Sequence, residues 1–471
     1  MTSAYYENRK RLAQAIPRTG TLLEAAQTQA IRLKGRKTGY HEYRFDREEM
    51  VKQERLLNAE EVNSFVEISC RAGACPMCLN IDVWDGLLCP YGCKYCFADS
   101  FRATLYTAFF DNAKTMGLRH CDPDRYKRDL GELFNYRLTD PHTHVNPVRK
   151  AIAMNMPLRL GIRFEDFTKR EKKDGVSLEL LRYLASENYP VMINTKSDLI
   201  GHDDYVRALA DNKGKAAVHI TLISSDDKLL KELEPNAPSY QQRINAMKSL
   251  VDAGIRVVAR VEPYAVFLND DESAVYRYIE DVWDAGVRNI TFDSYSYTGR
   301  DPGIIRNWAN LGLDWDRMFL VSAESQPVSS YMLGSFMEMF REKGFSCSTF
   351  DMGNVPTNSQ DICCEVTDLF TDSQFNYGCT VMAARFVRQT EGSVGWGAYE
   401  GWVMEHGGFL SPALKAEVKQ LWNAVGNNAY SQCWAPGIVP VGIDQDGIVW
   451  EYDSDVVDFR QDIFNNSTNP I

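Results

Sequence analysis

Short apolar runs alternate with longer amphipathic stretches from about residue 80 to residue 295, and this alternation restricts the fold more than any other feature of the chain. Short runs bounded by turn residues are typical of strands, and the amphipathic stretches between them are typical of crossover helices. A chain that repeats strand and helix forms βα units around a parallel sheet. The expected strands are 83–88, 157–163, 191–194, 217–222, 256–261 and 289–293. The expected helices are 177–187, 204–211, 226–232, 239–253 and 272–285.

The predicted fold class is α/β, with a partial (β/α)6 barrel between an N-terminal helical lead-in and a C-terminal extension. We expect a helical region over 1–66, the barrel over 67–300 and a C-terminal domain or cap over 301–471. The first part is polar and includes a helical run at 48–57. Because such barrels carry their chemistry at the C-terminal ends of the strands, motifs that directly follow strands matter most.

The composition predicts a globular protein with an acidic surface. Fifty-two basic and 64 acidic residues give a net charge of −12, so the surface as a whole repels polyphosphates. Most of the twelve cysteines fall in tight clusters, which favours metal ligation in a reducing compartment over a disulfide scaffold. No window approaches the roughly 18 consecutive apolar residues of a membrane span, so we expect a cytoplasmic protein without membrane contact.

Three cysteines, Cys89, Cys93 and Cys96, form a CxxxCxxC motif directly after the first expected strand. Three thiolates on one tight loop can hold three corners of a four-iron cluster and leave the fourth iron open for another ligand. Gly92 allows the loop to turn sharply, and Tyr95 places an aromatic ring beside the last thiol. The alternative is a structural zinc site, but such sites usually pair two CxxC knuckles across a longer separation.

The motif, with its aromatic residue before the third cysteine and a strand before the loop, resembles the signature of the radical S-adenosylmethionine (SAM) superfamily. The resemblance implies a 4Fe-4S cluster on Cys89, Cys93 and Cys96, with SAM bound at the open iron. It implies that an electron from the cluster cleaves SAM to a 5′-deoxyadenosyl radical, which abstracts hydrogen from a substrate. It also implies an electron donor such as flavodoxin or ferredoxin, and a place for Tyr95 near the adenine.

A narrower resemblance covers about residues 80–295, that is, the barrel but neither terminal region. The order of its segments is similar to that of the spore photoproduct lyase group and its uncharacterised relatives. The segments are 157–167 (PLRLGIRFEDF), 193–197 (INTKS), 218–222 (VHITL), 233–239 (LEPNAPS), then Arg243 on a helix that closes at 252–255 (DAGI).

This narrower resemblance implies roles for four residues. Lys196 would approach the SAM carboxylate or the substrate, and Arg243 the SAM carboxylate, which an Arg fork can bind through both oxygens. Thr221 and Ser224 would approach the ribose hydroxyls. The alternatives are solvated positions for Lys196 and Arg243, and local turn bonds for Thr221 and Ser224. Glu234 is expected either in the site or as an organiser of the turn before the next helix.

Spore photoproduct lyase returns hydrogen to its product through a cysteine outside the cluster motif. The candidate for this catalytic role here is Cys121, which follows His120. No flanking motif aligns Cys121 with that donor, so the alternative is a buried and inert thiol.

Two further groups of cysteines flank the barrel in the sequence. Either group, or one site built from both, would suit an auxiliary iron-sulfur cluster, and zinc at Cys75 and Cys78 with two distant partners is an equal alternative. Buried thiols without metal are the third interpretation, and the adjacent pair Cys363 and Cys364 favours it, since neighbouring side chains rarely point at one metal. The groups are Cys70, Cys75 and Cys78 before the cluster motif, and Cys347, Cys363, Cys364 and Cys379 after the barrel.

These features leave three classes of function. The first, which we favour slightly, is a radical SAM enzyme that acts on a nucleobase, nucleoside or DNA, with Tyr264, Tyr295 and Tyr297 as candidates to stack a flipped base. The second is a radical SAM enzyme that modifies a peptide or protein with the help of an auxiliary cluster. The third is a metal-binding protein without activity, the weakest hypothesis because the barrel pattern and the open-iron loop occur together.

Overall fold

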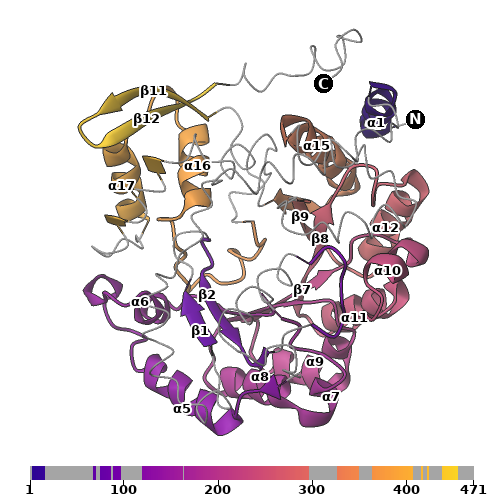
Figure 1. Ribbon diagram of the computed structural model, residues 1–471. Coiled ribbons are helices and arrows are strands. Elements are labelled where there is room, and N and C mark those ends of the chain that lie inside the picture. The colour runs from indigo at the N-terminus through magenta and orange to yellow at the C-terminus, as the bar shows by residue number, and fades with distance from the viewer. Residues whose placement is uncertain are drawn as a thin grey trace, which may run out of the picture.

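The computed structural model describes residues 3–15, 67–70, 75–85, 89–96, 119–162, 164–295, 326–349, 363–406, 415–416, 419, 422–423 and 438–453 (Figure 1). The expected helical run at 48–57 lies outside these residues.

An eight-stranded sheet forms the centre of the fold, in the order β1-β2-β5-β6-β7-β8-β9-β10. β1 is antiparallel to β2, and every neighbouring pair from β2 to β10 is parallel. β1 and β10 lie at opposite ends of this order, so the predicted α/β class with an open, partial barrel is confirmed. The strands are β1 (Glu67–Cys70), β2 (Leu79–Asp82), β5 (Leu158–Leu160), β6 (Val191–Thr195), β7 (Ala216–Thr221), β8 (Arg256–Tyr264), β9 (Asn289–Ser294) and β10 (Ser346–Thr349).

Helices follow the strands at the expected places, each within one or two residues of the predicted bounds. Their start signals are local: Asp226, Ser239 and Asp271 are N-caps, and Ser239 forms a capping box with Gln242. In the part of the chain that the structure describes, no helix has the length and apolar content to cross a bilayer. The helices of the barrel are α5 (Pro123–Phe134), α6 (Pro147–Ala153), α7 (Glu171–Asp174), α8 (Val176–Ser186), α9 (Asp203–Ala210), α10 (Asp227–Leu233), α11 (Tyr240–Asp252) and α12 (Glu272–Asp284).

The first strand differs from the prediction. The sheet strand is β2, and the expected run at 83–88 contributes only β3 (Trp84–Asp85), which pairs with β4 (Arg119–His120) in a separate two-stranded sheet. Trp84 is held outside the main sheet by two carboxylates: its backbone N–H donates to Asp166 Oδ1 (3.3 Å) and its indole N–H to Glu171 Oε2 (2.8 Å). The predicted strand at 83–88 is therefore wrong for its described residues, and the strand of the main sheet lies a few residues earlier.

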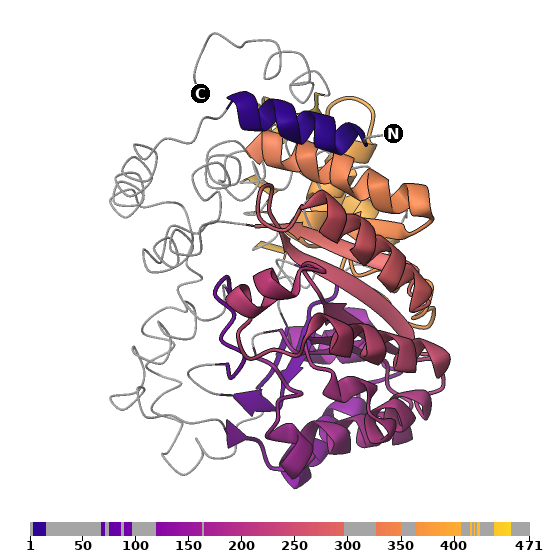
Figure 2. The same cartoon turned by 90° about the vertical axis from the view of Figure 1, so that its right-hand side faces the viewer.

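The sheet continues beyond residue 300 by one strand, β10, which pairs with β9. The helix before it, α15 (Gln326–Lys343), lies beside α1 (Ala4–Ala15) in Figure 2, and the Phe336 ring lies 5.2 Å from the Tyr5 ring. The C-terminal elements, drawn in orange and yellow in Figure 1, are α16 (Thr380–Gln389), α17 (Trp396–Glu405), β11 (Ile438–Asp444) and β12 (Gly447–Tyr452). The predicted domain boundaries at 66 and 300 stay predictions.

The two faces of the sheet are covered by different parts of the chain. Alternate strand residues such as Ile193 and Ile220 belong to the large core shared with the barrel helices. Their neighbours Met192, Ala217 and Val258 instead pack in a second apolar cluster with the C-terminal segment around Phe370. A segment far along the chain thus fills the face of the sheet that the helices leave open.

The backbone geometry of Gly161, directly after β5, predicts that replacement by alanine lowers the stability of the fold strongly. Its φ is +75°, and a Cβ here would lie 1.9 Å from the carbonyl oxygen of Asn194 on β6. Gly254 has almost the same φ, +76°, and nothing lies within 4 Å of its Cβ position. We expect Gly254→Ala to lower the free energy of unfolding by about 1–2 kcal/mol through its backbone conformation alone. Gly161→Ala adds overpacking and should lower it by about 2–5 kcal/mol.

Urea unfolding followed by circular dichroism measures both glycine variants. Equal losses of stability would show that the close approach of β5 and β6 at Gly161 does not constrain the fold.

Candidate metal-cluster site

The loop that carries Cys89, Cys93 and Cys96 is built from two tight turns and is fixed to a distant segment. Gly92, in the left-handed region at φ +59°, donates its N–H to the Cys89 carbonyl (3.1 Å), and Cys96 donates to the Cys93 carbonyl (3.1 Å). The Lys94 N–H donates to Leu233 O (2.8 Å), and the Asn236 side-chain amide donates to Pro90 O (3.0 Å). The segment 233–236 therefore holds the cluster loop in place.

The three thiols are half-buried and close enough to influence one another. Burial raises the pKa of the Cys93 thiol well above its usual range, and Lys196 opposes this. The Glu234 carboxylate and the thiols of Cys96 and Cys89 raise the pKa further. A positive charge beside the loop thus favours the thiolate form that iron requires.

The donor set of the loop is three thiols on one turn. The three thiolates of an open cluster bind three different irons and leave a fourth iron free for another ligand. Within the described ranges, no three or more His, Cys, Asp or Glu side chains gather tightly enough around one point to hold one metal ion. The 4Fe-4S cluster on Cys89, Cys93 and Cys96 stays a prediction, as does the zinc alternative.

A series of buried polar contacts connects the cluster loop to the end of β7. The Tyr95 hydroxyl donates to Glu234, and Glu234 pairs with Arg243. Both side chains of this ion pair are fully buried. Arg243 also donates to the carbonyl oxygens of Thr221 (3.0 Å) and Pro238 (2.9 Å). Glu234 therefore has the structural role that the sequence left open, and it joins the loop to the end of β7.

Arg243 keeps its charge despite burial. Burial alone would lower the pKa of Arg243, but the Glu234 carboxylate outweighs it and the pKa is raised. The pKa of Tyr95 is raised by burial and by the negative charge of Glu234, so the phenol stays protonated and keeps donating. The guanidinium of Arg243 is committed to protein partners, and its predicted contact with a SAM carboxylate stays a prediction.

Lys196 faces the cluster loop from the end of β6. Its Nζ lies 5.5 Å from the centre of the Tyr95 ring. Its backbone N–H donates to Glu165 Oε2 (2.9 Å), and the neighbouring Thr195 hydroxyl donates to Glu165 Oε1 (2.6 Å). Among the described residues, no carboxylate lies within ion-pair distance of Lys196 Nζ, so this ammonium group is available to an anionic ligand.

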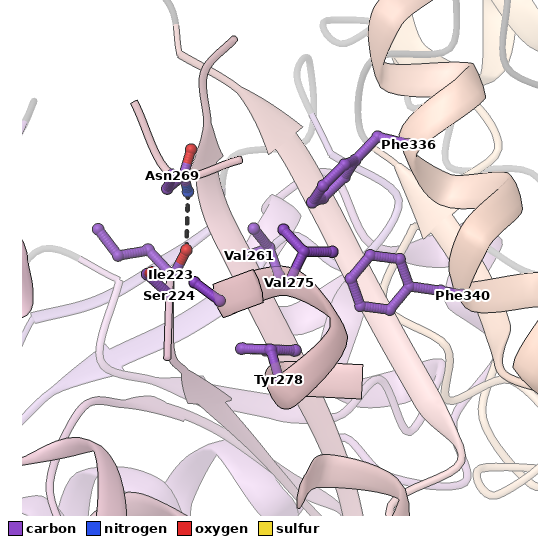
Figure 3. Close-up of a pocket in the computed structure, with 9 residues that line it drawn as sticks. Ile223, Ser224, Val261, Asn269, Val275, Tyr278, Phe336 and Phe340 are labelled. Carbon is purple, nitrogen blue, oxygen red and sulfur yellow. Dashed lines mark hydrogen bonds between the residues drawn. The ribbon is translucent and has the colours of Figure 1, made fainter. Parts of the chain in front are cut away.

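Thr221 and Ser224 lie at the end of β7 and in the turn after it. The Thr221 side chain is buried, and its carbonyl accepts from Arg243. The Ser224 hydroxyl accepts the N–H of Asp226 (3.1 Å), which is the local turn bond considered from the sequence. Ser224 also lines a small pocket, drawn in Figure 3, with apolar side chains such as Phe336 of α15. Contacts of Thr221 or Ser224 with a ribose stay predictions.

Cys121 lies in the core beside the short β3–β4 sheet. Its N–H donates to Val83 O (3.0 Å), and burial, with a smaller effect of Asp166, raises the pKa of its thiol to about 12. The thiol is therefore neutral at ordinary pH, as a hydrogen donor must be. No contact among the described residues joins Cys121 to the cluster loop, and its catalytic role stays a prediction.

The predicted role in base stacking is wrong for Tyr264 and Tyr295, the two candidate tyrosines that the structure describes. Tyr264 is fully buried, its hydroxyl lies 2.8 Å from that of Tyr5, and its ring lies 4.6 Å from Phe336. Tyr295 is likewise a core residue. Tyr264 packs between α1, α15 and the sheet, and both rings are buried, so neither offers a face to a base. Tyr297 lies outside the described residues.

The structure divides the outer cysteines between two apolar clusters, and Cys70 and Cys78, whose sulfurs lie 3.2 Å apart, belong with the large core. Cys75 and Met77 belong to the same apolar cluster as Cys363, Cys364 and Cys379. Cys347 is apart from them: it is a core residue of β10 whose thiol lies 3.7 Å from Phe345 O.

Sequence reasoning missed two residues at these sites. Asn236 binds the cluster loop, and its only signal was its place inside the 233–239 segment. Arg159 is a buried cation beside the second group of cysteines, and its signal was a single charge inside the apolar strand β5.

Comparisons with known proteins find distant similarity only. No family model matches the chain. Uncharacterised proteins of Mycobacterium bovis and Mycobacterium tuberculosis are each 22% identical to it over 297 residues, which covers 59% of this chain and 78% of theirs. Among solved structures, a spore photoproduct lyase mutant with bound AdoMet and dinucleoside spore photoproduct matches at 15% identity and a TM-score of 0.36, over 52% of this chain and 64% of its own. Streptococcus suis SuiB bound to S-adenosylmethionine matches at 14% identity and a TM-score of 0.35, over 57% of this chain and 49% of its own. The match thus spans less than two thirds of either of these solved chains.

The buried pair Glu234–Arg243 predicts a large loss of stability when one partner is removed. Arg243→Met leaves an unpaired buried carboxylate and should lower the free energy of unfolding by about 3–5 kcal/mol. The matched control is Arg277→Met, which breaks the exposed Arg277–Asp281 pair (3.4 Å) and should cost less than about 1 kcal/mol.

The double variant Glu234→Gln with Arg243→Met isolates the coupling in this pair. Because it removes both charges, its loss in urea unfolding should be clearly smaller than the sum of the two single losses. Additive losses would mean that the two side chains do not act as a pair.

Proposed function

We propose that this chain is a radical SAM enzyme that starts its reaction by reductive cleavage of SAM. The observation that carries the proposal is the loop of Cys89, Cys93 and Cys96, closed by two turns and fixed through Tyr95 to the buried Glu234–Arg243 pair. Three neighbouring thiols on a rigid loop suit a cluster with one open iron. The strand order of the parallel sheet is open, and an open barrel leaves room for a substrate beside such a site.

When bound, the 4Fe-4S cluster and SAM supply a 5′-deoxyadenosyl radical for hydrogen abstraction. The residues of the chain bind and position these groups. Lys196, which has no carboxylate partner among the described residues, is the cation for the SAM carboxylate. Arg243 acts as a positioning residue, because it fixes Glu234 and thereby the Tyr95 hydroxyl. We assign Thr221, at the end of β7, and Ser224, in the turn after it, to contacts with the ribose hydroxyls of SAM.

The reaction also needs one electron from outside the site. A flavodoxin or ferredoxin is the natural class of donor, and dithionite replaces it in vitro. The chain is assigned to a reducing compartment of the cytoplasm, because its cluster thiols must stay reduced to bind iron.

Two substrate classes follow from different observations. A nucleobase, nucleoside or DNA follows from the similarity of segments 157–167 and 233–239 to the spore photoproduct lyase group. The burial of Tyr264 and Tyr295 removes two expected stacking rings, and the charge of −12 opposes binding to a polyanion. A peptide or protein follows from the gathering of extra cysteines around Cys75, which suits an enzyme with an auxiliary cluster.

Anaerobic reconstitution with dithionite and SAM tests the proposed chemistry. We expect the wild-type chain to release 5′-deoxyadenosine, and Cys93→Ala to release less than about 1% of that amount, because two thiolates would leave a second iron without a protein ligand and the cluster would not be retained. Cys347→Ala is the control, since this thiol lies in the core of β10, and it should retain activity. Equal product from Cys93→Ala and wild type would place the cluster elsewhere.

The substrate classes are separated by salt dependence. If the substrate is DNA, binding of a labelled oligonucleotide should weaken steeply between 50 and 200 mM salt, by about tenfold or more for several phosphate contacts. Stimulation of 5′-deoxyadenosine release by peptides, with no oligonucleotide binding at the lower salt, would instead identify a peptide substrate.

A further inference from the structure

The face of the sheet opposite the barrel helices changes from apolar to polar along the strands. Near the start of the strands, the residues of this face pack in the second apolar cluster: Met192, Ala217 and Val258. Because side chains alternate between the two faces of a sheet, the residue two positions later on each strand lies on the same face. These later residues are all polar: Asn194 on β6, His219 on β7 and Arg260 on β8. We refer to these three residues as the inner polar group.

Two members of the inner polar group have buried atoms without partners. Asn194 and His219 are directly paired in the register of β6 and β7, and they are only 8% and 2% exposed. Among the described residues, neither Asn194 Oδ1 nor His219 Nε2 has a hydrogen-bond partner. A buried polar atom without a partner lowers stability, and folded proteins keep few of them. Two such atoms on neighbouring strands are typical of a site that a ligand completes.

Arg260, the third member, retains hydrogen-bond donors for a ligand. It lies one position nearer the strand ends than this pair, in register with Thr221 on β7 and Thr291 on β9. Its Nη2 pairs with Glu262, and among the described residues its Nε and Nη1 have no acceptor. The Arg260 side chain is 22% exposed. A ligand therefore reaches this guanidinium group first.

The surroundings of the inner polar group favour an anion. Arg159 on β5 is buried on the same face, and among the described residues no Asp or Glu lies within ion-pair distance of it. Burial lowers the pKa of His219 well below its usual value, and the charges of Arg260 and Arg159 lower it further, so the ring is neutral. Of the nearby carboxylates, Glu262 is paired with Arg260, and Asp293 on β9 has an interaction partner of its own. The guanidinium groups thus attract an anionic ligand and repel a cationic one.

We propose that the inner polar group binds an anionic group of the substrate, either a carboxylate or a phosphate. The inference rests on the proposed function, because it concerns the substrate of the same barrel. The free donors of Arg260 bind oxygens of the anion, and the neutral ring of His219 donates through Nε2. The amide of Asn194 donates through its NH2 group, and its oxygen accepts from an N–H or O–H of the same ligand. Arg159 adds positive charge from the covered end of the face.

Anion binding to the SAM-loaded chain, measured without reductant, tests this inference separately from radical chemistry. Saturating SAM occupies the cation that the proposed function assigns to its carboxylate, Lys196. The probes are inorganic phosphate and succinate. Isothermal titration should give a Kd of about 1 mM for one of these anions, the range of a few charge-assisted contacts. Tighter binding of phosphate would identify a phosphate group in the substrate, and tighter binding of succinate a carboxylate.

Substitutions of Arg260 test its contact with the anion. Arg260→Met should weaken binding of the preferred probe by about tenfold or more, because it removes a charge and its donors. Arg260→Lys keeps the charge and should lose less. The matched control is Arg256→Met, on the same strand and face. The guanidinium of Arg256 is already committed to Asp368 (3.0 Å), so its loss should leave anion binding unchanged.

Asn194→Leu separates a binding role from a structural one. The Asn194 amide has no partner among the described residues, so an apolar side chain of similar size should keep or raise the midpoint of urea unfolding. The same variant should bind the preferred anion several-fold more weakly. A change that stabilises the chain and weakens binding is expected of a residue kept for its ligand.

Three results would overturn the inference. They are no binding of either anion at about 10 mM, equal binding by Arg260→Met and Arg256→Met, and intact binding in Asn194→Leu with a lower unfolding midpoint. If circular dichroism shows that Arg260→Met does not fold, Arg260→Lys and Asn194→Leu still decide. Intact anion binding in a chain that releases no 5′-deoxyadenosine would count against the proposed function alone.

Discussion

The ion pair between Glu234 and Arg243 is the interaction on which the geometry of the candidate site depends. Neither charge reaches solvent, so each is tolerated only because the other is present and because two backbone carbonyls take further donors of Arg243. Glu234 uses its other oxygen to accept from Tyr95, in the middle of the cluster loop. These contacts hold the cluster loop at the end of β7, whereas its local turns alone would not fix its position. The position of the three thiols relative to the sheet is thus set by a buried electrostatic contact.

The sheet carries two groups of cysteines in different surroundings. The loop of Cys89, Cys93 and Cys96 is half-buried and faces Lys196, which directly follows β6. Cys75 packs against the apolar cluster that the C-terminal segment forms on the sheet, and Arg159 Nη1 lies 3.6 Å from its sulfur. Both groups depend on the same parallel sheet, because β5 carries Arg159 and the end of β6 leads to Lys196.

The alternation of apolar runs and amphipathic stretches predicted most of the barrel correctly. Runs such as 191–194 and 217–222 are buried strands, and caps such as Ser239 start helices where their side-chain chemistry indicates. The sheet strand predicted at 83–88 is wrong because Asp166 and Glu171, distant in sequence, hold Trp84 out of the sheet. The prediction of base stacking by Tyr264 and Tyr295 is wrong because a strand end does not reveal what packs on it, and here α1 and α15 pack on Tyr264. No local pattern reports such long-range contacts.

By itself, the sequence determined what depends on near neighbours along the chain: the order of strands and helices, their caps and the spacing of Cys89, Cys93 and Cys96 on one loop. Only the tertiary structure decided what depends on distant partners. It placed Glu234 and Arg243 beside Tyr95, and it joined Cys75 to Asn376 across 301 positions, which brings Cys379 into the apolar cluster beside Cys75. The physical reason is that propensity and turn geometry act over a few residues, whereas buried charges and thiols find partners by packing, which is a property of the whole chain.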